Sequence, residues 1–308
     1  MRIRPEKLFG RPPTAVVPAR APVPEEPYHE PDLSPAQHQA LGDLRAEGIA
    51  VTTFDDLVGD DELWRELDAD MEAYVGRAQR LAPKRARPKQ KDDFLVRRWA
   101  HSGKGSGVDD SRIALDSPWL RFASSDRLLD VVNSYRGVYT KLVGLDNLYT
   151  VPFPRSDARV SSQRWHRDPE DLHVVKCLLY FSDVDRDSGP FEYVRGSAAG
   201  GPYGDLWAWG TSWLTDRGVE ERWYPPDGEL EAKIPASERL QLVGPKGTLI
   251  LCDTSGFHRG GFARAKPRVL SIHTYISPAS DYEKMNFAVA WGDGDARLSR
   301  QARYALTT

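Results

Sequence analysis

The stretch that decides the fold covers residues 161–191 and reads SSQRWHRDPEDLHVVKCLLYFSDVDRDSGPF. Its middle is a run of apolar and β-branched residues, which predicts a buried strand over 173–182. We also expect a strand over 160–168. Because alternate residues of a strand point to the same face, His166 and Asp168 should project side by side from its end.

Around this stretch, short segments rich in Val, Leu, Ile, Tyr and Phe are bounded by Gly, Pro, Asp and Ser. They predict further strands over 144–152, 190–195, 239–243, 247–252, 260–264 and 267–276. The preceding chain predicts helices instead, with a start signal at Ser34-Pro35, and further helices over about 60–81 and 125–136. The expected fold is α+β: a double-sheet β core with a helical N-terminal layer.

The chain divides by composition. Residues 1–33 are rich in proline and charge and predict an extended tail, and residues 34–308 predict a single domain. Within it, 34–141 should be mainly helical layer and loops, and 142–277 the β core. The basic and glycine-rich loop at 82–110 is either solvated, a flap over a site or a clamp for an anionic substrate.

An insertion at about 197–237 interrupts the strand pattern of the core. It is dense in aromatic residues, namely Tyr203, Trp207, Trp209, Trp213, Trp223 and Tyr224. Such a stretch is either a satellite core under a long loop or a lid over a substrate pocket, since long loops in compact domains are often functional.

The bulk numbers exclude several classes of protein. A net charge of −3 over 308 residues does not indicate the excess of basic residues that is typical of nucleic-acid-binding proteins. There is no secretory leader pattern and no run of about 18 apolar residues, so we expect a soluble, cytoplasmic protein without a membrane span. Cys177 and Cys252 lie in apolar runs and are expected to be small buried hydrophobes. The oligomeric state is not readable from the sequence.

The chemistry rests on two histidines and a carboxylate. His258 follows another apolar strand, GTLILCD, and can join His166 and Asp168. These residue types form the facial triad of non-haem Fe(II) oxygenases, which leaves one face of the metal open for a co-substrate and O₂. His-x-Asp alone is a weak signal. Arg268 opens a strand ten residues after His258, and a guanidinium binds a carboxylate such as that of 2-oxoglutarate bidentately.

Three features together resemble the phytanoyl-CoA dioxygenase (PhyH-like) family: QRWHRD at 163–168, YFSDVDRDSGPFEYVRGS at 180–197, and the spacing from His258 to Arg268. The resemblance covers roughly 142–277. It implies a double-stranded β-helix (jelly-roll) core, with iron on the triad and 2-oxoglutarate anchored by Arg268. It also implies oxidation of a C–H bond of a small-molecule substrate, with release of succinate and CO₂.

The chain departs from the family on the substrate side. Many members have a histidine after the Gly-Ser of the block, where this chain reads GSAAGG at 196–201. The substrate of a relative therefore does not transfer. Halogenating relatives carry a small residue at the carboxylate position, so Asp168 argues against halogenation.

Other polar residues have weaker assignments. Lys176 lies inside VVKCLLYF, where a buried lysine needs a partner. It either pairs with an acid or helps Arg268 to hold the 2-oxoglutarate carboxylate. Gln163 is expected to contact a co-substrate oxygen. Asp253 should cap a turn before His258.

The remaining histidines divide into structural and open cases. His173 is expected to be structural because its strand has turned away from the triad. By alternation His273 should face away from Arg268. His101 lies in the glycine-rich loop and could contact substrate.

Two other functions stay open. One is a cupin-like metal-dependent enzyme that does not use 2-oxoglutarate, in which Arg268 is structural. The other is a jelly-roll binding or scaffold protein in which the His-x-Asp pattern is incidental.

Overall fold

The computed structural model describes residues 27–85, 94–99, 108–153, 159–206, 224–225, 228–280, 282, 285–291 and 297–307. Most of the predicted tail and of the 82–110 loop, including His101, lies outside these ranges. So do Trp207, Trp209, Trp213 and Trp223 of the predicted insertion.

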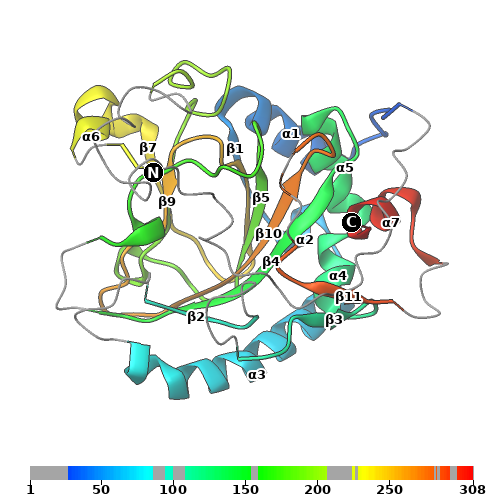
Figure 1. The fold of residues 1–308 in the computed structure, drawn as a ribbon, viewed down its shortest axis with the longest axis horizontal. Helices are drawn as coiled ribbons and strands as arrows, with labels where there is room; N and C mark the ends of the chain where they lie inside the picture. Colours follow the sequence, from blue (N-terminus) through cyan, green and yellow to red (C-terminus); the bar gives the residue numbers. More distant parts are fainter. Residues whose placement is uncertain are drawn as a thin grey trace, which may run out of the picture.

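The largest element is a six-stranded antiparallel sheet, which Figure 1 shows running through the middle of the molecule. Its order is β1-β8-β5-β10-β4-β2. The strands in that order are β1 (Ile49–Thr53), β8 (Thr248–Asp253), β5 (Val175–Tyr180), β10 (Arg268–Ile276), β4 (Lys141–Thr150) and β2 (Leu95–Arg97). Strands far apart in sequence are therefore neighbours, and the sheet needs contacts between segments that span residues 49–276.

A smaller antiparallel sheet packs against one face of the large one. It has the order β7 (Arg239–Leu242), β6 (Phe191–Val194), β9 (His258–Arg259). The core between the sheets includes Leu178, Ile250 and Leu270 from the large sheet and Phe191, Tyr193 and Leu242 from the small one. Antiparallel sheets that share one apolar core confirm the predicted β core. Two further short strands, β3 (Arg112–Ala114) and β11 (Ala288–Ala290), pair in parallel.

Helices cover the opposite face of the large sheet. They are α1 (Pro35–Glu47), α2 (Phe54–Leu57), α3 (Asp61–Arg85), α4 (Pro118–Ala123) and α5 (Asp126–Arg136), with α7 (Arg300–Leu306) later in the chain. In contrast, α6 (Glu229–Lys233) lies beside the small sheet, where Leu230 packs in a cluster with Val194 and Phe257. Leu44 and Phe122 share a core with Cys177 and Leu249 of the sheet. Among the described helices, none combines the length and apolar character needed to cross a bilayer.

The first helix begins as the sequence predicts. The Ser34 side chain accepts from the backbone N–H of Gln37, whose own side chain accepts from the Ser34 N–H, which completes a capping box. Gly48 ends the helix at φ 77°, a left-handed conformation that favours glycine. A Cβ on Gly48 would also lie 2.5 Å from the hydroxyl of Tyr193, so glycine is needed for space as well.

Two predicted strands are wrong. Residues 160–168 form a 3-10 turn at Ser161–Gln163 followed by extended chain that makes one isolated bridge, from His166 to His258. Residues 260–264 form no strand, and Gly261 passes too close to Gly189 and Pro190 for any side chain. Trp165 of the first segment packs near Val194 of the small sheet, and Phe262 of the second packs in the core on the helical side, so the apolar pattern reflects burial and not membership of a ladder.

Candidate metal centre

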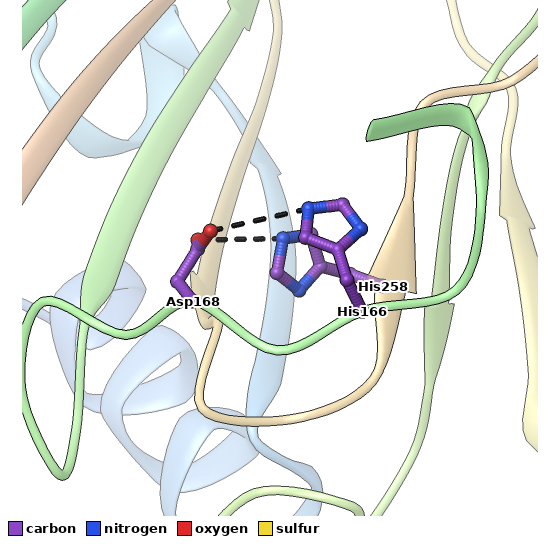
Figure 2. Close-up of side chains that lie close together, drawn as sticks. All are labelled: His166, Asp168 and His258. Carbon is purple, nitrogen blue, oxygen red and sulfur yellow. Dashed lines mark ion pairs between the residues drawn. The ribbon is translucent and has the colours of Figure 1, made fainter. Parts of the chain in front are cut away.

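His166, Asp168 and His258 converge at one point, each offering one ligand atom within 4.8 Å of the others (Figure 2). His166 and Asp168 lie in the extended segment before β5, and His258 opens β9. Two backbone hydrogen bonds of 3.0 Å, His166 N to His258 O and the reverse, fix the two histidines beside each other. One β-bridge between segments distant in the sequence thus brings His166 and His258 together, and Asp168 lies two residues after His166.

The backbone sets the orientation of both imidazoles. His166 Nδ1 lies 2.8 Å from the carbonyl oxygen of Arg164, and His258 Nδ1 lies 2.9 Å from that of Gly256. A carbonyl only accepts, so each Nδ1 carries the proton and donates it. Each Nε2 then presents a lone pair, and both Nε2 atoms face Asp168. Fixing the tautomer through Nδ1 is how proteins prepare metal-binding histidines.

The distances fit a single metal ion. Ligand atoms 2.0–2.1 Å from an octahedral metal lie about 3 Å apart along an edge. His258 Nε2 is 3.3 Å from Asp168 Oδ2, and His166 Nε2 is 3.9 Å from Asp168 Oδ1. Asp168 Oδ2 is buried between His258 Nε2 and the Lys176 ammonium, which lies 2.5 Å from it, and Asp168 Oδ1 faces His166 Nε2. A cation among the two Nε2 atoms and this carboxylate would have three adjacent donors and one open face.

Protonation states favour ligation. Burial, with repulsion from His258, lowers the pKa of His166 to about 3, so its imidazole is neutral at physiological pH. Burial alone would raise the pKa of Asp168, but Lys176 and His258 outweigh it and hold that pKa well below its usual range. The centre therefore offers a neutral imidazole and an ionised carboxylate, as a metal requires.

Lys176 lies on β5, with its Nζ 2.5 Å from Asp168 Oδ2. Of the two predicted partners for this buried lysine, the structure provides the acid. Burial would lower the pKa of the Lys176 ammonium, but Asp168 and Glu170 together raise it above its ordinary value. Burial, with the charge of Asp168, raises the pKa of Glu170 to about 7.

Arg268 begins β10 and is 5% exposed. Its guanidinium donates to the carbonyl of Gly189, and its backbone pairs with Thr150 of β4. It shares a face of the strand with Leu270, which lies in the core between the two sheets. His273 packs edge-on against Phe122 at 5.0 Å on the helical side, as alternation predicts.

Gln163 closes the 3-10 turn before the triad. It is 3% exposed, and its side-chain oxygen accepts from the backbone N–H of Val160 at 3.3 Å. The described contact is local, and a contact with a co-substrate stays a prediction.

Arg167, which the sequence did not single out, lies between the first two triad residues and points away from them. Its guanidinium donates to five backbone carbonyls and lies 3.9 Å from the ring of Phe257; the five are those of Ser197, Tyr203, Gly204, Leu206 and Ser255. Burial lowers its pKa to about 10, so it stays charged at neutral pH. One side chain thus clamps the 197–206 loop and the loop that leads to His258 onto the triad segment.

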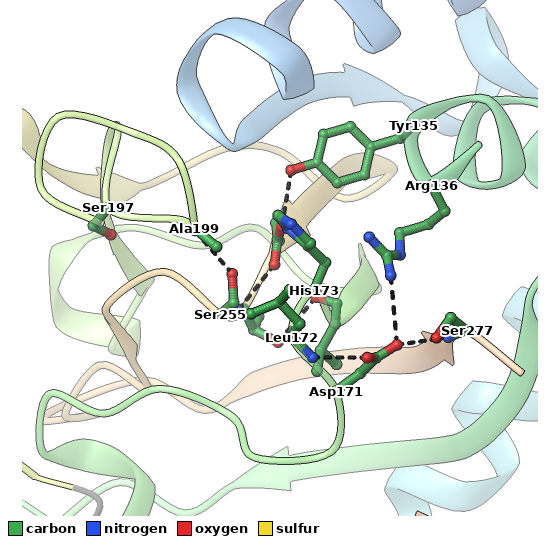
Figure 3. A network of polar contacts seen from close by, with 12 residues as sticks. Tyr135, Arg136, Asp171, Leu172, His173, Ser197, Ala199, Ser255 and Ser277 are labelled. Atoms are coloured by element: carbon green, nitrogen blue, oxygen red, sulfur yellow. Dashed lines mark hydrogen bonds and ion pairs between the residues drawn. The ribbon is translucent and has the colours of Figure 1, made fainter. Parts of the chain in front are cut away.

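A second polar network supports the same loop (Figure 3). Asp253 is fully buried, and its carboxylate lies 2.8 Å from the Tyr135 hydroxyl and 2.5 Å from His173 Nδ1. Its other oxygen accepts from the Ser255 N–H at 3.0 Å. This last contact confirms the predicted turn role of Asp253. His173 is a structural partner of that turn, as predicted.

Tyr224 is a further aromatic neighbour of the centre. Its ring lies 6.0 Å from that of His166, and the Arg164 guanidinium lies 4.3 Å from the Tyr224 ring. Tyr224 belongs to the predicted aromatic insertion, and its ring contacts a residue of the triad.

No protein-family model matches this sequence, and no curated protein does. Solved structures do match. EctD from S. alaskensis with 2-oxoglutarate and 5-hydroxyectoine is 17% identical and has a TM-score of 0.51, covering 90% of this chain and 86% of its own. EctD with bound Fe is 16% identical at a TM-score of 0.50, with coverages of 96% and 92%.

A carbocyclase, SnoK from nogalamycin biosynthesis, described as non-heme and alpha ketoglutarate dependent, is 13% identical with a TM-score of 0.49. It covers 87% of this chain and 94% of its own. At these identities the likeness to EctD establishes a shared fold.

Proposed function

We propose that this protein is an Fe(II)/2-oxoglutarate-dependent oxygenase with a jelly-roll core, related to the PhyH-like enzymes, that oxidises a C–H bond of a small molecule. The observation that carries the proposal is the preformed donor set. Two imidazoles with Nδ1 fixed by backbone carbonyls face one buried, ionised carboxylate. The fold supports it, because EctD shares the fold and its structures contain Fe and 2-oxoglutarate.

Each residue has a defined task in this proposal. His166, Asp168 and His258 hold the iron on one face. When bound, Fe(II), 2-oxoglutarate and O₂ supply an oxidation coupled to decarboxylation, which yields succinate and CO₂. The surrounding chain contributes the ligands' orientation, a dry site and the positioning of the substrate.

Arg268 is the proposed anchor for the distal carboxylate of 2-oxoglutarate. Its guanidinium stays charged at any working pH, is buried, and lies on the strand face that lines the space between the sheets. A buried guanidinium favours a bidentate carboxylate because both groups are otherwise costly to desolvate. Gln163 is a proposed minor contact of the co-substrate.

The test is an anaerobic titration with Fe(II) and 2-oxoglutarate, monitored by the visible charge-transfer band of the keto-acid chelate. We expect the band in the wild type, its loss in His258→Ala, and a raised 2-oxoglutarate requirement in Arg268→Ala. Arg127→Ala is the matched control for the second variant, because Arg127 is exposed on α5.

The outcomes separate the three functions. Tight iron binding without a band would favour a cupin-like enzyme that does not use 2-oxoglutarate. Failure of the wild type to bind iron would favour a binding or scaffold protein.

A further inference from the structure

Lys176 is placed where a cation can act on the metal through its ligand. Its ammonium lies 2.5 Å from Asp168 Oδ2, the same oxygen that lies 3.3 Å from His258 Nε2. Lys176 shares the inner face of β5 with Leu178 and Tyr180, which belong to the core between the sheets. The Lys176 side chain is 20% exposed and that of Asp168 is 9% exposed, so the ion pair is largely shielded from solvent.

The neighbouring strands leave this cation few alternatives. Lys176 pairs in register with Cys252 on β8 and Thr274 on β10, and both of those side chains are uncharged. The carboxylates that interact with it electrostatically are Asp168 first and Glu170 second. A buried ammonium that left Asp168 would need an equally good partner, because an unpaired buried charge is strongly unfavourable.

A fixed cation on a ligand carboxylate has an electronic consequence. It withdraws negative charge from the oxygen that donates to the metal, so the carboxylate becomes a weaker donor and the metal a weaker reductant. Partners outside the ligand set tune metal sites in this way, through hydrogen bonds and nearby charges. The sign of the effect depends only on the charge of Lys176 and its persistence beside Asp168.

We propose that Lys176 keeps its ion pair with Asp168 when the metal is bound and is a positioning residue that lowers the electron density at the metal. The inference rests on the proposed function, because it takes the triad to be the metal site. It assigns Lys176 to the metal ligand and not to the 2-oxoglutarate carboxylate.

The experiment compares Lys176→Met with Lys266→Met. Lys266 is an exposed lysine that also lies 2.5 Å from a carboxylate, that of Asp185, so the control removes the same charge from an ion pair of the same length. The first readout is the d–d absorption of the Co(II)-loaded protein without 2-oxoglutarate. The second is the position of the Fe(II)/2-oxoglutarate charge-transfer band.

In Lys176→Met the carboxylate becomes a stronger donor. We expect the Co(II) bands to move to shorter wavelength and the charge-transfer band to longer wavelength. Lys266→Met and Lys176→Arg, which keeps the positive charge, should match the wild type. Lys176→Gln gives the same comparison if the Met variant does not fold.

Co(II) bands that stay in place in Lys176→Met and Lys176→Gln would overturn the inference, because the lysine would then have left Asp168. Shifted Co(II) bands with no charge-transfer band in the wild type would uphold the inference and refute the use of 2-oxoglutarate.

Discussion

Replacement of Arg167 by methionine tests whether one buried side chain holds the metal-binding loops in place. Methionine keeps much of the length and apolar volume of the arginine stem but removes the guanidinium. The variant leaves five backbone carbonyls without their donor, in the 197–206 loop and at Ser255. None of these carbonyls belongs to the triad.

The magnitude follows from the contacts. Hydrogen bonds to charged groups contribute about 1.5–3 kcal/mol each, but five bonds from one guanidinium share two nitrogens and are not additive. The loss of the guanidinium's own desolvation cost offsets part of the total. We therefore expect a fall of about 3 kcal/mol in the free energy of unfolding, a substantial share of the 5–15 kcal/mol of a typical domain.

The assay is equilibrium unfolding in urea with the metal removed. With a slope of about 3 kcal/mol per molar, a loss of about 3 kcal/mol lowers the midpoint by about 1 M. Arg127→Met is the control, because Arg127 is exposed on α5 and its replacement should change stability by less than about 0.5 kcal/mol. Arg167→Lys should resemble the methionine variant, since an ammonium cannot span the two loops.

A second measurement on the same variants is metal affinity, for example of Ni(II) by calorimetry. Arg167→Met frees the loop that carries His258, so metal binding should weaken although all three donors remain. An unfolding midpoint of Arg167→Met equal to that of Arg127→Met would show that the carbonyls find other partners, and the clamp would then have no energetic role.

Three further predictions follow from the same geometry. Burial lowers the pKa of His273 to about 3 from 6.5, so folding is favoured above pH 6.5 and this stability is lost as pH falls toward 3. His273→Leu should therefore reduce the loss of stability between pH 7 and pH 5 by about 2 kcal/mol, measured by urea unfolding at both pH values; an unchanged loss would contradict the burial argument. Asp253→Asn should lower the free energy of unfolding by about 1–3 kcal/mol and weaken Ni(II) binding, because Tyr135 and His173 lose a charged acceptor. A thermal unfolding midpoint equal to that of the wild type would show that this network does not stabilise the fold. Saturating Fe(II) or Ni(II) should stabilise the wild type by about 2.7 kcal/mol at 100 times Kd but leave His166→Ala unchanged; an equal shift in both proteins would place the metal elsewhere.

The sequence predicts the parts of this site that depend on local pattern. The apolar strands over 173–182 and 267–276 correspond to β5 and β10, and the Ser34-Pro35 start signal corresponds to α1. Alternation along β10 separates Arg268 from His273 because period two survives wherever a strand is paired on both sides.

His166 and Asp168 lie close together as predicted, but not because they alternate along a ladder strand. Their segment is not a ladder strand, and its backbone is fixed by one bridge to His258 and by the bond from Asp168 N to Thr254 O at 2.9 Å. Both partners lie more than eighty residues away, and no period in the local sequence encodes a contact of that range.

Arg167 marks the limit of sequence reasoning most clearly. An arginine between two ligands in an extended segment ordinarily points to solvent, and nothing in QRWHRD distinguishes that case from burial. The outcome depends on the 197–206 loop folding back to present its carbonyls, which in turn depends on the glycines there. A Cβ on Gly201 would lie 2.4 Å from the carbonyl oxygen of Gly196, so the loop closes only with glycine at that position. Burial of Arg167 is therefore linked to the sequence GSAAGG at 196–201, because these residues form part of the loop that the guanidinium holds.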